Sequence, residues 1–169
     1  MNVIVLNGCP RSGKDEFAKI ASEIYKTRNI SSIDNVKEFA LHMGWDGNKS
    51  KLGREMLSEL KAFYIKYFDG PFNDIKKEIQ RSIIDNIDIL FVHIREPEEI
   101  DKLVKYCEEI NISIYTIIIQ RPEYIHLCED SKSDKKVYDH KYDYMIINNG
   151  SIEEYREKVK KFIKYIIAP

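Results

Sequence analysis

Apolar residues along the chain follow two alternating patterns, one with the period of a strand and one with the period of a helix. Short β-branched runs predict strands at 3–6, 30–33, 87–94, 112–119 and 142–147. Between these runs, apolar residues recur every three or four positions and predict helices from about 13, over 34–43, in two pieces over 49–85, over 97–109 and from 151 onward. Strands that alternate with helices predict an α/β protein whose five strands form a central, mostly parallel sheet.

Two helix boundaries carry clear local signals. Gly70-Pro71 combines a glycine C-cap with a proline at the start of a helix, so it predicts two separate helices between 49 and 85. Ser151 is followed three residues later by Glu154, which is the spacing of a capping box. We therefore expect the last helix to start next to Ser151.

The length of 169 residues and the hydrophobic share of 43% predict a single domain, residues 1–169, with a full apolar core. The predicted helices of residues 34–85 form a long segment between the second and third predicted strands. Residues 122–141 mix charges of both signs without a clear period, and their length makes them a candidate lid.

Charge and hydropathy exclude several classes of partner. A formal net charge of −1 gives no general attraction to nucleic acid or to an anionic membrane. The N-terminus has no secretion signal, and no apolar run approaches the roughly 20 residues that span a bilayer. We therefore expect a cytoplasmic protein, a monomer or homodimer, that acts on small molecules. Cys9, Cys107 and Cys128 fit neither a disulfide framework nor a zinc site, so we expect reduced thiols.

One segment carries a specific chemical signal. After the first predicted strand the sequence reads Gly8-Cys9-Pro10-Arg11-Ser12-Gly13-Lys14-Asp15-Glu16, which contains the phosphate-binding pattern G-x-x-x-x-G-K. The glycines let the backbone turn its N–H groups toward a phosphate, and the following helix N-terminus adds partial positive charge. Lys14 is placed to reach the β- and γ-phosphates, so the segment predicts ATP binding. The four-residue spacing, the adjacent Gly-Lys and the N-terminal position disfavour the alternative, a glycine turn with a chance lysine.

Asp15 stands where this loop usually has Ser or Thr. A carboxylate is a hard oxygen ligand, so we expect Asp15 to hold Mg²⁺ directly or through water. The alternative role is that of an ordinary acidic residue in the first turn of a helix, where it interacts with the helix dipole.

Several segments resemble one group of kinases. The loop is similar to that of nucleoside monophosphate kinases, and its Arg-Ser-Gly-Lys-Asp ending resembles the bacteriophage deoxynucleoside monophosphate kinases, although animal-type phosphomevalonate kinases share Ser-Gly-Lys-Asp. Further resemblance to the phage enzymes lies in residues 53–57, 92–99, 120–122 and 142–151. The resemblance implies a three-layer α/β/α P-loop kinase fold in which the helices of residues 34–85 form an acceptor-binding insertion. It also implies ATP- and Mg²⁺-dependent transfer of a phosphoryl group to a (deoxy)nucleoside monophosphate, giving the diphosphate.

Phosphoryl transfer needs several cations around the moving group. Arg95 and Arg121 each follow a predicted strand, at the edge where α/β sheets bind ligands, so we expect both to act with Lys14 in catalysis; surface ion pairs are the alternative. The resemblance implies that Arg54 binds the acceptor phosphate, and a solvated helical arginine is the alternative. Trp45 is a candidate for stacking on the acceptor base, against the alternative of packing in the core.

His93 departs from the pattern of these kinases. It ends the third predicted strand, where they have an acidic residue that helps to orient Mg²⁺. The imidazole either bonds a phosphate or a water, or simply closes an apolar strand. This departure keeps a second function open, a P-loop nucleotide-binding protein without kinase activity. A kinase for a non-nucleotide phosphorylated small molecule, or for a polynucleotide 5′ end, is a third alternative because it needs the same loop.

Overall fold

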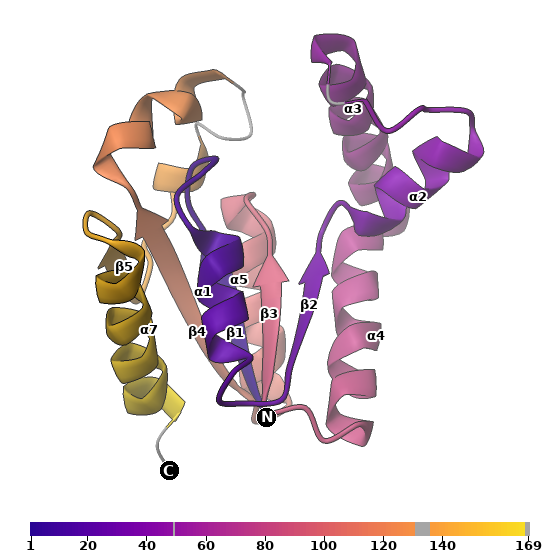
Figure 1. Ribbon diagram of the computed structural model, residues 1–169. Coiled ribbons are helices and arrows are strands. Elements are labelled where there is room, and N and C mark those ends of the chain that lie inside the picture. The colour runs from indigo at the N-terminus through magenta and orange to yellow at the C-terminus, as the bar shows by residue number, and fades with distance from the viewer. Residues whose placement is uncertain (49, 131–135, 168–169) are drawn as a thin grey trace.

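A computed structural model describes residues 1–48, 50–130 and 136–167 of the chain (Figure 1). Within these residues, five strands form one parallel sheet in the order β2-β3-β1-β4-β5. The strands are β1 (Asn2–Asn7), β2 (Thr27–Ser31), β3 (Ile89–His93), β4 (Ser113–Gln120) and β5 (Tyr144–Ile147). The predicted fold class is confirmed. The edge strand β2 begins before the apolar run that predicted it, because its first residues are polar.

Helices cover both faces of the sheet, so the architecture has three layers (Figure 1). The helices are α1 (Lys14–Ala21), α2 (Asp34–His42), α3 (Lys51–Phe68), α4 (Gly70–Ile84), α5 (Pro97–Glu109) and α7 (Ile152–Ile167), with 3₁₀ segments η1 (Pro122–Asp130) and η2 (Lys136–Tyr138). In β1, Ile4 and Leu6 face α1 and α7, whereas Val3 and Val5 face α4 and α5. Both faces of the strand are apolar because both are buried, as a parallel sheet requires.

The helices α2 and α3 form an arm beside the carboxyl edge of the sheet. Val36, Ala40 and Leu57 make a small core in this arm, separate from the two cores that lie against the sheet. Figure 1 shows the loop between β1 and α1 at that same edge, with η1 on one side of it and the arm on the other. The next helix, α4, instead packs on the sheet through Ile75 and Ile79.

The junction between α3 and α4 differs in detail from the sequence prediction. Two helices are present, as expected, but the left-handed residue that ends α3 is Asp69, with φ 50°. Gly70 is the first residue of α4, and a Cβ built there would lie 2.2 Å from the ring of Tyr64. Gly70 is therefore required by the close approach of an aromatic ring and is not the C-cap of α3.

The capping box at the last helix is confirmed. The Ser151 backbone N–H donates to Glu154 Oε2 (2.8 Å), and the Glu154 N–H donates to Ser151 Oγ (3.2 Å). Across the part of the chain that the structure describes, no helix combines the length and apolar character needed to cross a bilayer.

Candidate functional site

The predicted phosphate loop connects β1 to α1 at the carboxyl edge of the sheet. Gly8 and Gly13 have φ angles of 143° and 104°, which side chains rarely adopt. A Cβ on Gly8 would lie 2.3 Å from the carbonyl oxygen of Ile119, and one on Gly13 would lie 2.6 Å from Asn148 Nδ2. Both glycines are therefore fixed by backbone conformation and by space. Arg11, also in the loop, is exposed and has a φ of 62°.

Lys14 folds back over the loop. Its Nζ atom donates to the carbonyl oxygens of Gly8 (2.7 Å) and Cys9 (2.9 Å). A lysine in this position neutralises part of the carbonyl charge and keeps its ammonium group at the mouth of the loop. An anionic phosphate offers the ammonium a stronger, charge-assisted partner than these carbonyls do.

Residues far along the chain hold the loop from below. Asn148 donates from Nδ2 to the carbonyl of Ser12 (3.0 Å), and the hydroxyl of Tyr155 donates to the carbonyl of Gly13 (3.1 Å). Tyr155 is 2% exposed, and burial raises the pKa of its hydroxyl, which therefore stays protonated as a donor. The loop conformation thus depends on β5 and α7 as well as on its own glycines.

We expect Tyr155→Phe to lower the free energy of unfolding by about 1 kcal/mol, because the Gly13 carbonyl loses one hydrogen bond while the ring packing is kept. Urea unfolding followed by circular dichroism measures this change. Tyr165→Phe, on the same helix but with a tyrosine that is 73% exposed, is the matched control and should have no effect. Equal stabilities of the two variants would contradict the prediction.

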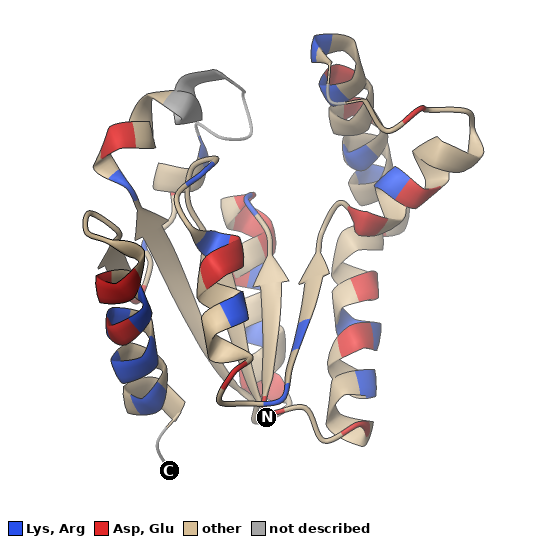
Figure 2. Cartoon of the chain, in the orientation of Figure 1, with Lys and Arg blue, Asp and Glu red and all other residues tan. Residues whose placement is uncertain are grey.

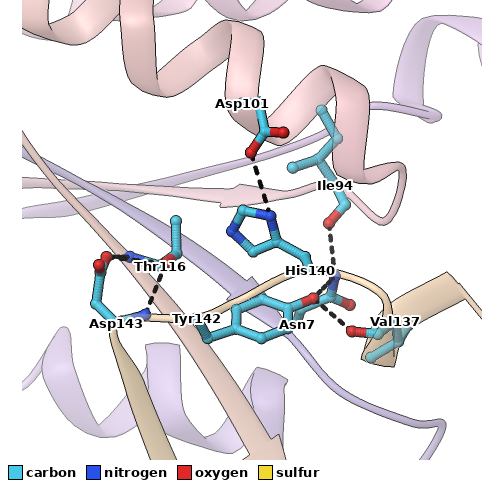
Figure 3. Close-up of polar contacts among 8 residues, drawn as sticks. All are labelled: Asn7, Ile94, Asp101, Thr116, Val137, His140, Tyr142 and Asp143. Atoms are coloured by element: carbon cyan, nitrogen blue, oxygen red, sulfur yellow. Dashed lines mark hydrogen bonds and ion pairs between the residues drawn. The ribbon is translucent and has the colours of Figure 1, made fainter.

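A buried polar junction fixes the end of β1, as Figure 3 shows. Asn7 donates from Nδ2 to the carbonyl of Ile94 (3.0 Å) and to the Tyr142 hydroxyl (2.7 Å). Its Oδ1 accepts the Gly8 N–H (2.9 Å), and Tyr142 donates onward to the Val137 carbonyl (2.8 Å). Every polar atom of the Asn7 side chain is used, so β1, the segment after β3 and the η2 segment are joined directly below the loop.

The expectation of reduced thiols is wrong for Cys9. This loop residue is disulfide-bonded, and its Sγ accepts a hydrogen bond from the Tyr138 hydroxyl at 3.1 Å. Cys107 is free and lies on the buried face of α5, where burial raises the pKa of its thiol to about 12. It is a core residue.

An open pocket of about 380 Å³ lies beside α1, and Asp15 and His93 both line it. Asp15 is exposed in the first turn of α1, so its carboxylate is accessible to a metal ion. Burial lowers the pKa of His93, against the opposing charge of Asp15, so the imidazole is neutral at pH 7. Asp15 and His93 therefore line the same pocket. His93 stands where the resembling kinases have an acidic residue, and it offers a nitrogen in place of a carboxylate oxygen.

The basic residues singled out from the sequence gather at the carboxyl edge. Figure 2 shows blue positions in the phosphate loop, after β3 and β4, and along α3. Arg95 is half-buried directly after β3. Arg121 follows β4, where its Nε lies 3.1 Å from Glu123 and its guanidinium stacks 5.0 Å from the ring of Tyr124. Arg54 is exposed in the first turns of α3, in the arm.

Trp45 packs against the small core of the arm and donates from Nε1 to the Asn48 carbonyl at 3.1 Å. This is the packing role that the sequence left open. Glu16 lies in the first turn of α1 next to Lys19 (3.9 Å). The candidate lid, 122–141, contains η1 and η2, and its residues 131–135 lie outside the described residues.

Sequence reasoning missed a buried ion pair between the arm and the sheet. Lys61 of α3 is 9% exposed and donates from Nζ to both carboxylate oxygens of Glu96 (2.8 and 2.7 Å) and to Ser32 Oγ (2.8 Å). Its helical spacing from Leu57 and Tyr64 placed it on the apolar face, and this was the available signal. The pair joins the ends of β2 and β3 to α3.

Comparison with known proteins supports the fold. No protein-family profile matches the sequence. The chain is 24% identical to the UPF0200 protein TV0279 of Thermoplasma volcanium, over 95% of this chain and 96% of that protein. At this level of identity the similarity does not establish membership of a family.

Three solved structures illustrate the structural similarity. The tunicamycin resistance protein of Deinococcus radiodurans is 11% identical with a TM-score of 0.57, and 96% of each chain is covered. A sugar kinase from Janibacter sp. is 12% identical with a TM-score of 0.57, covering 100% of this chain and 96% of that one. The Mycobacterium tuberculosis APS kinase CysC, in complex with AMPPNP and APS, is 15% identical with a TM-score of 0.50, covering 96% and 97%. The chain has the three-layer fold of P-loop kinases.

Proposed function

We propose that the protein transfers the γ-phosphoryl group of ATP to a small phosphorylated acceptor, most specifically a (deoxy)nucleoside monophosphate. The observation that carries the proposal is the loop itself, in which two obligatory glycines and Lys14 sit at the N-terminus of α1. This arrangement binds phosphate through backbone N–H groups and the helix dipole. The similarity to solved kinases supports the transfer of a phosphoryl group, and the resemblance to phage kinases supports the acceptor.

The reaction needs positioning and charge more than acid–base chemistry. Loop N–H groups from Gly8 to Lys14 would hold the β-phosphate, and the Lys14 ammonium would leave its two carbonyl partners for the β- and γ-phosphates. An acceptor phosphate oxygen is already anionic, so no strong general base is required. Arg95 and Arg121 follow the strands on either side of β1, within the layer where the transferred group must lie. A divalent ion would neutralise charge on the phosphates when bound.

The ATP base has a candidate place beside the loop. An open pocket of about 370 Å³ is lined by Asn148, Asn149, Gly150, Glu154, Tyr155 and Lys158. Because Asn148 and Tyr155 also hold the loop carbonyls, a base in this pocket would be directly connected to bound phosphates. The acceptor then takes the opposite side, toward the α2 and α3 arm.

A coupled assay of ADP release tests the function. We expect ATP turnover to rise when one member of a panel of ribo- and deoxyribonucleoside monophosphates is added. The same panel should contain non-nucleotide phosphates. Stimulation by a non-nucleotide phosphate alone would support kinase activity but contradict the nucleoside monophosphate as acceptor. Tight ATP binding without stimulation by any acceptor would favour the P-loop protein without kinase activity, which the nitrogen donor His93 at the strand end supports.

Arg54→Ala should raise the acceptor KM about 10-fold or lower kcat by a similar factor, with little change in ATP affinity. A guanidinium that holds the acceptor phosphate contributes to binding of that substrate and not to binding of ATP, and such a charged hydrogen bond is worth about 1.5 kcal/mol or more. Steady-state kinetics with each substrate varied in turn separates the effects. Arg81→Ala, on α4 with a side chain 72% exposed, is the control. Unchanged kcat and unchanged KM for both substrates would contradict a role of Arg54 in acceptor binding.

A further inference from the structure

The backbone around Arg95 is held from two sides. On one side, the carbonyl of Ile94 accepts a hydrogen bond from Asn7 Nδ2 at 3.0 Å (Figure 3). Asn7 Oδ1 in turn accepts the first N–H of the phosphate loop at 2.9 Å. On the other side, both carboxylate oxygens of Glu96 accept from Lys61 Nζ, and Glu96 Oε2 also accepts the Arg95 N–H at 3.4 Å. Arg95 therefore lies between one anchor to the phosphate loop and one anchor to the arm.

All the donors of the Lys61 ammonium are used in this anchor. An ammonium group has three N–H donors, and their acceptors here are the two oxygens of Glu96 (2.8 and 2.7 Å) and Ser32 Oγ (2.8 Å). Ser32 follows β2, and its backbone N–H donates to the carbonyl of His93 at the end of β3 (3.0 Å). Lys61 is only 9% exposed, so water competes little for these bonds. One side chain of the arm therefore joins the ends of two strands.

The helix face that carries Lys61 also carries the residue proposed to bind the acceptor. Arg54 precedes Lys61 by seven residues on α3, which is about two helical turns, so the two lie on one face about 10 Å apart along the axis. Arg95 directly follows β3, the neighbour of β1 in the sheet. Because Lys61 is bonded to Glu96, the same contact sets how α3, and with it Arg54, is placed relative to Arg95.

We propose that Lys61 and Glu96 are positioning residues for Arg95, which they hold in place relative to the phosphate loop and to the arm. The inference rests on the proposed function, in which Arg95 acts on the transferred phosphoryl group. Lys61 and Glu96 do not touch the substrate in this role. They fix the backbone from which the Arg95 guanidinium extends, so that the guanidinium is preorganised for the γ-phosphate before the nucleotide binds.

Selectivity for AMPPNP over ADP tests the inference without turnover, because the two ligands differ in the terminal phosphate. In calorimetric titrations of the full chain, Lys61→Met and Glu96→Ala should each lower this selectivity about 10-fold, through weaker binding of AMPPNP alone. Lys61→Arg keeps a charged donor for the carboxylate and should retain most of the selectivity. Arg28→Met is the matched control, since it breaks an ion pair between β2 and α4 (2.9 Å to Glu78) and should lower stability without changing selectivity.

A double-variant cycle separates positioning from stability. If Lys61 acts through Arg95, Lys61→Met should lower the selectivity of the wild type but change that of Arg95→Ala by less than about twofold, while the loss of stability is similar in both backgrounds. Glu96→Ala carries the same test if Lys61→Met does not fold. Additive losses, equal weakening of ADP and AMPPNP, or unchanged selectivity in the folded variants would overturn the inference. Non-additive losses without acceptor-stimulated ADP release would keep the positioning role and reject the kinase, and stimulated release with additive losses would do the reverse.

Discussion

Lys14→Ala is expected to reduce phosphoryl transfer at least 100-fold while the fold survives. The loss of a charge aimed at the transferred group should cost about 3 kcal/mol or more in the transition state. The ammonium donates to two loop carbonyls, at 2.7 and 2.9 Å, and the residue is only partly buried, outside the apolar core, so its removal should leave no core cavity. The free energy of unfolding should change by about 1 kcal/mol at most.

The measurement is kcat with the best acceptor of the panel, together with a thermal melt. Lys105→Ala, an exposed lysine of α5 far from the loop in sequence, is the matched control and should keep full activity. Unchanged turnover of a well-folded Lys14→Ala protein would remove the assignment of the loop. A lower melting temperature with lost activity would instead point to a structural role of the lysine.

Lys61→Met should destabilise the protein by about 3 kcal/mol, because it breaks the buried ion pair with Glu96. Burial lowers the pKa of Lys61, and the Glu96 carboxylate opposes this shift. Removal of the ammonium leaves Glu96, whose side chain is only 20% exposed, without its bidentate partner. An uncompensated buried charge costs more than the intact pair contributes.

Urea unfolding of Lys61→Met, Glu96→Gln and the double variant forms a mutant cycle that isolates the pair. The double variant should recover part of the loss, because no charge is then left buried alone. Lys66→Met, one exposed lysine further along α3, is the control. Additive losses in the cycle would show that the two side chains do not stabilise one another.

The same pair gives stability a pH dependence. Burial raises the pKa of Glu96, but the Lys61 ammonium outweighs burial, and the pKa lies below its ordinary value of 4.5. A carboxyl group whose pKa is lowered by folding contributes stability above its unfolded pKa and loses it as the pH falls through the folded pKa. Stability of the wild type should therefore fall in acid below about pH 4.5, and this part of the fall should be absent in Glu96→Gln. Equal acid profiles would contradict the assignment.

Local signals in the sequence predicted the fold and the loop well, since both depend on short spacings. The period of apolar residues sufficed for the sheet, and Gly8 and Gly13 sufficed to predict a tight loop between β1 and α1. The supports of that loop could not be predicted, because Asn148 and Tyr155 are 136 and 142 positions from the carbonyls that they bind. Such contacts follow from the order of the strands, which apolar periodicity does not specify.

The predictions for Gly70 and Lys61 failed for separate physical reasons. Gly70 was interpreted as a cap because glycine favours left-handed backbone, yet Asp69 adopts that conformation and Gly70 makes room for Tyr64. Lys61 was overlooked because a lysine on an apolar helix face is usually solvated at its tip. Its burial depends on Glu96, which lies on a different element, 35 positions away.

The arm of α2 and α3 has an evolutionary consequence. The arm has its own small apolar core of Val36, Ala40 and Leu57. Lys61 connects it to the ends of β2 and β3 through hydrogen bonds to Ser32 and Glu96. Substitutions within such an arm can reshape what it recognises while the phosphate loop, held from the other side by β5 and α7, keeps its geometry. Under the proposed function, a lineage carrying this fold could exchange one acceptor for another through substitutions in the arm alone, while the phosphate loop kept its conformation.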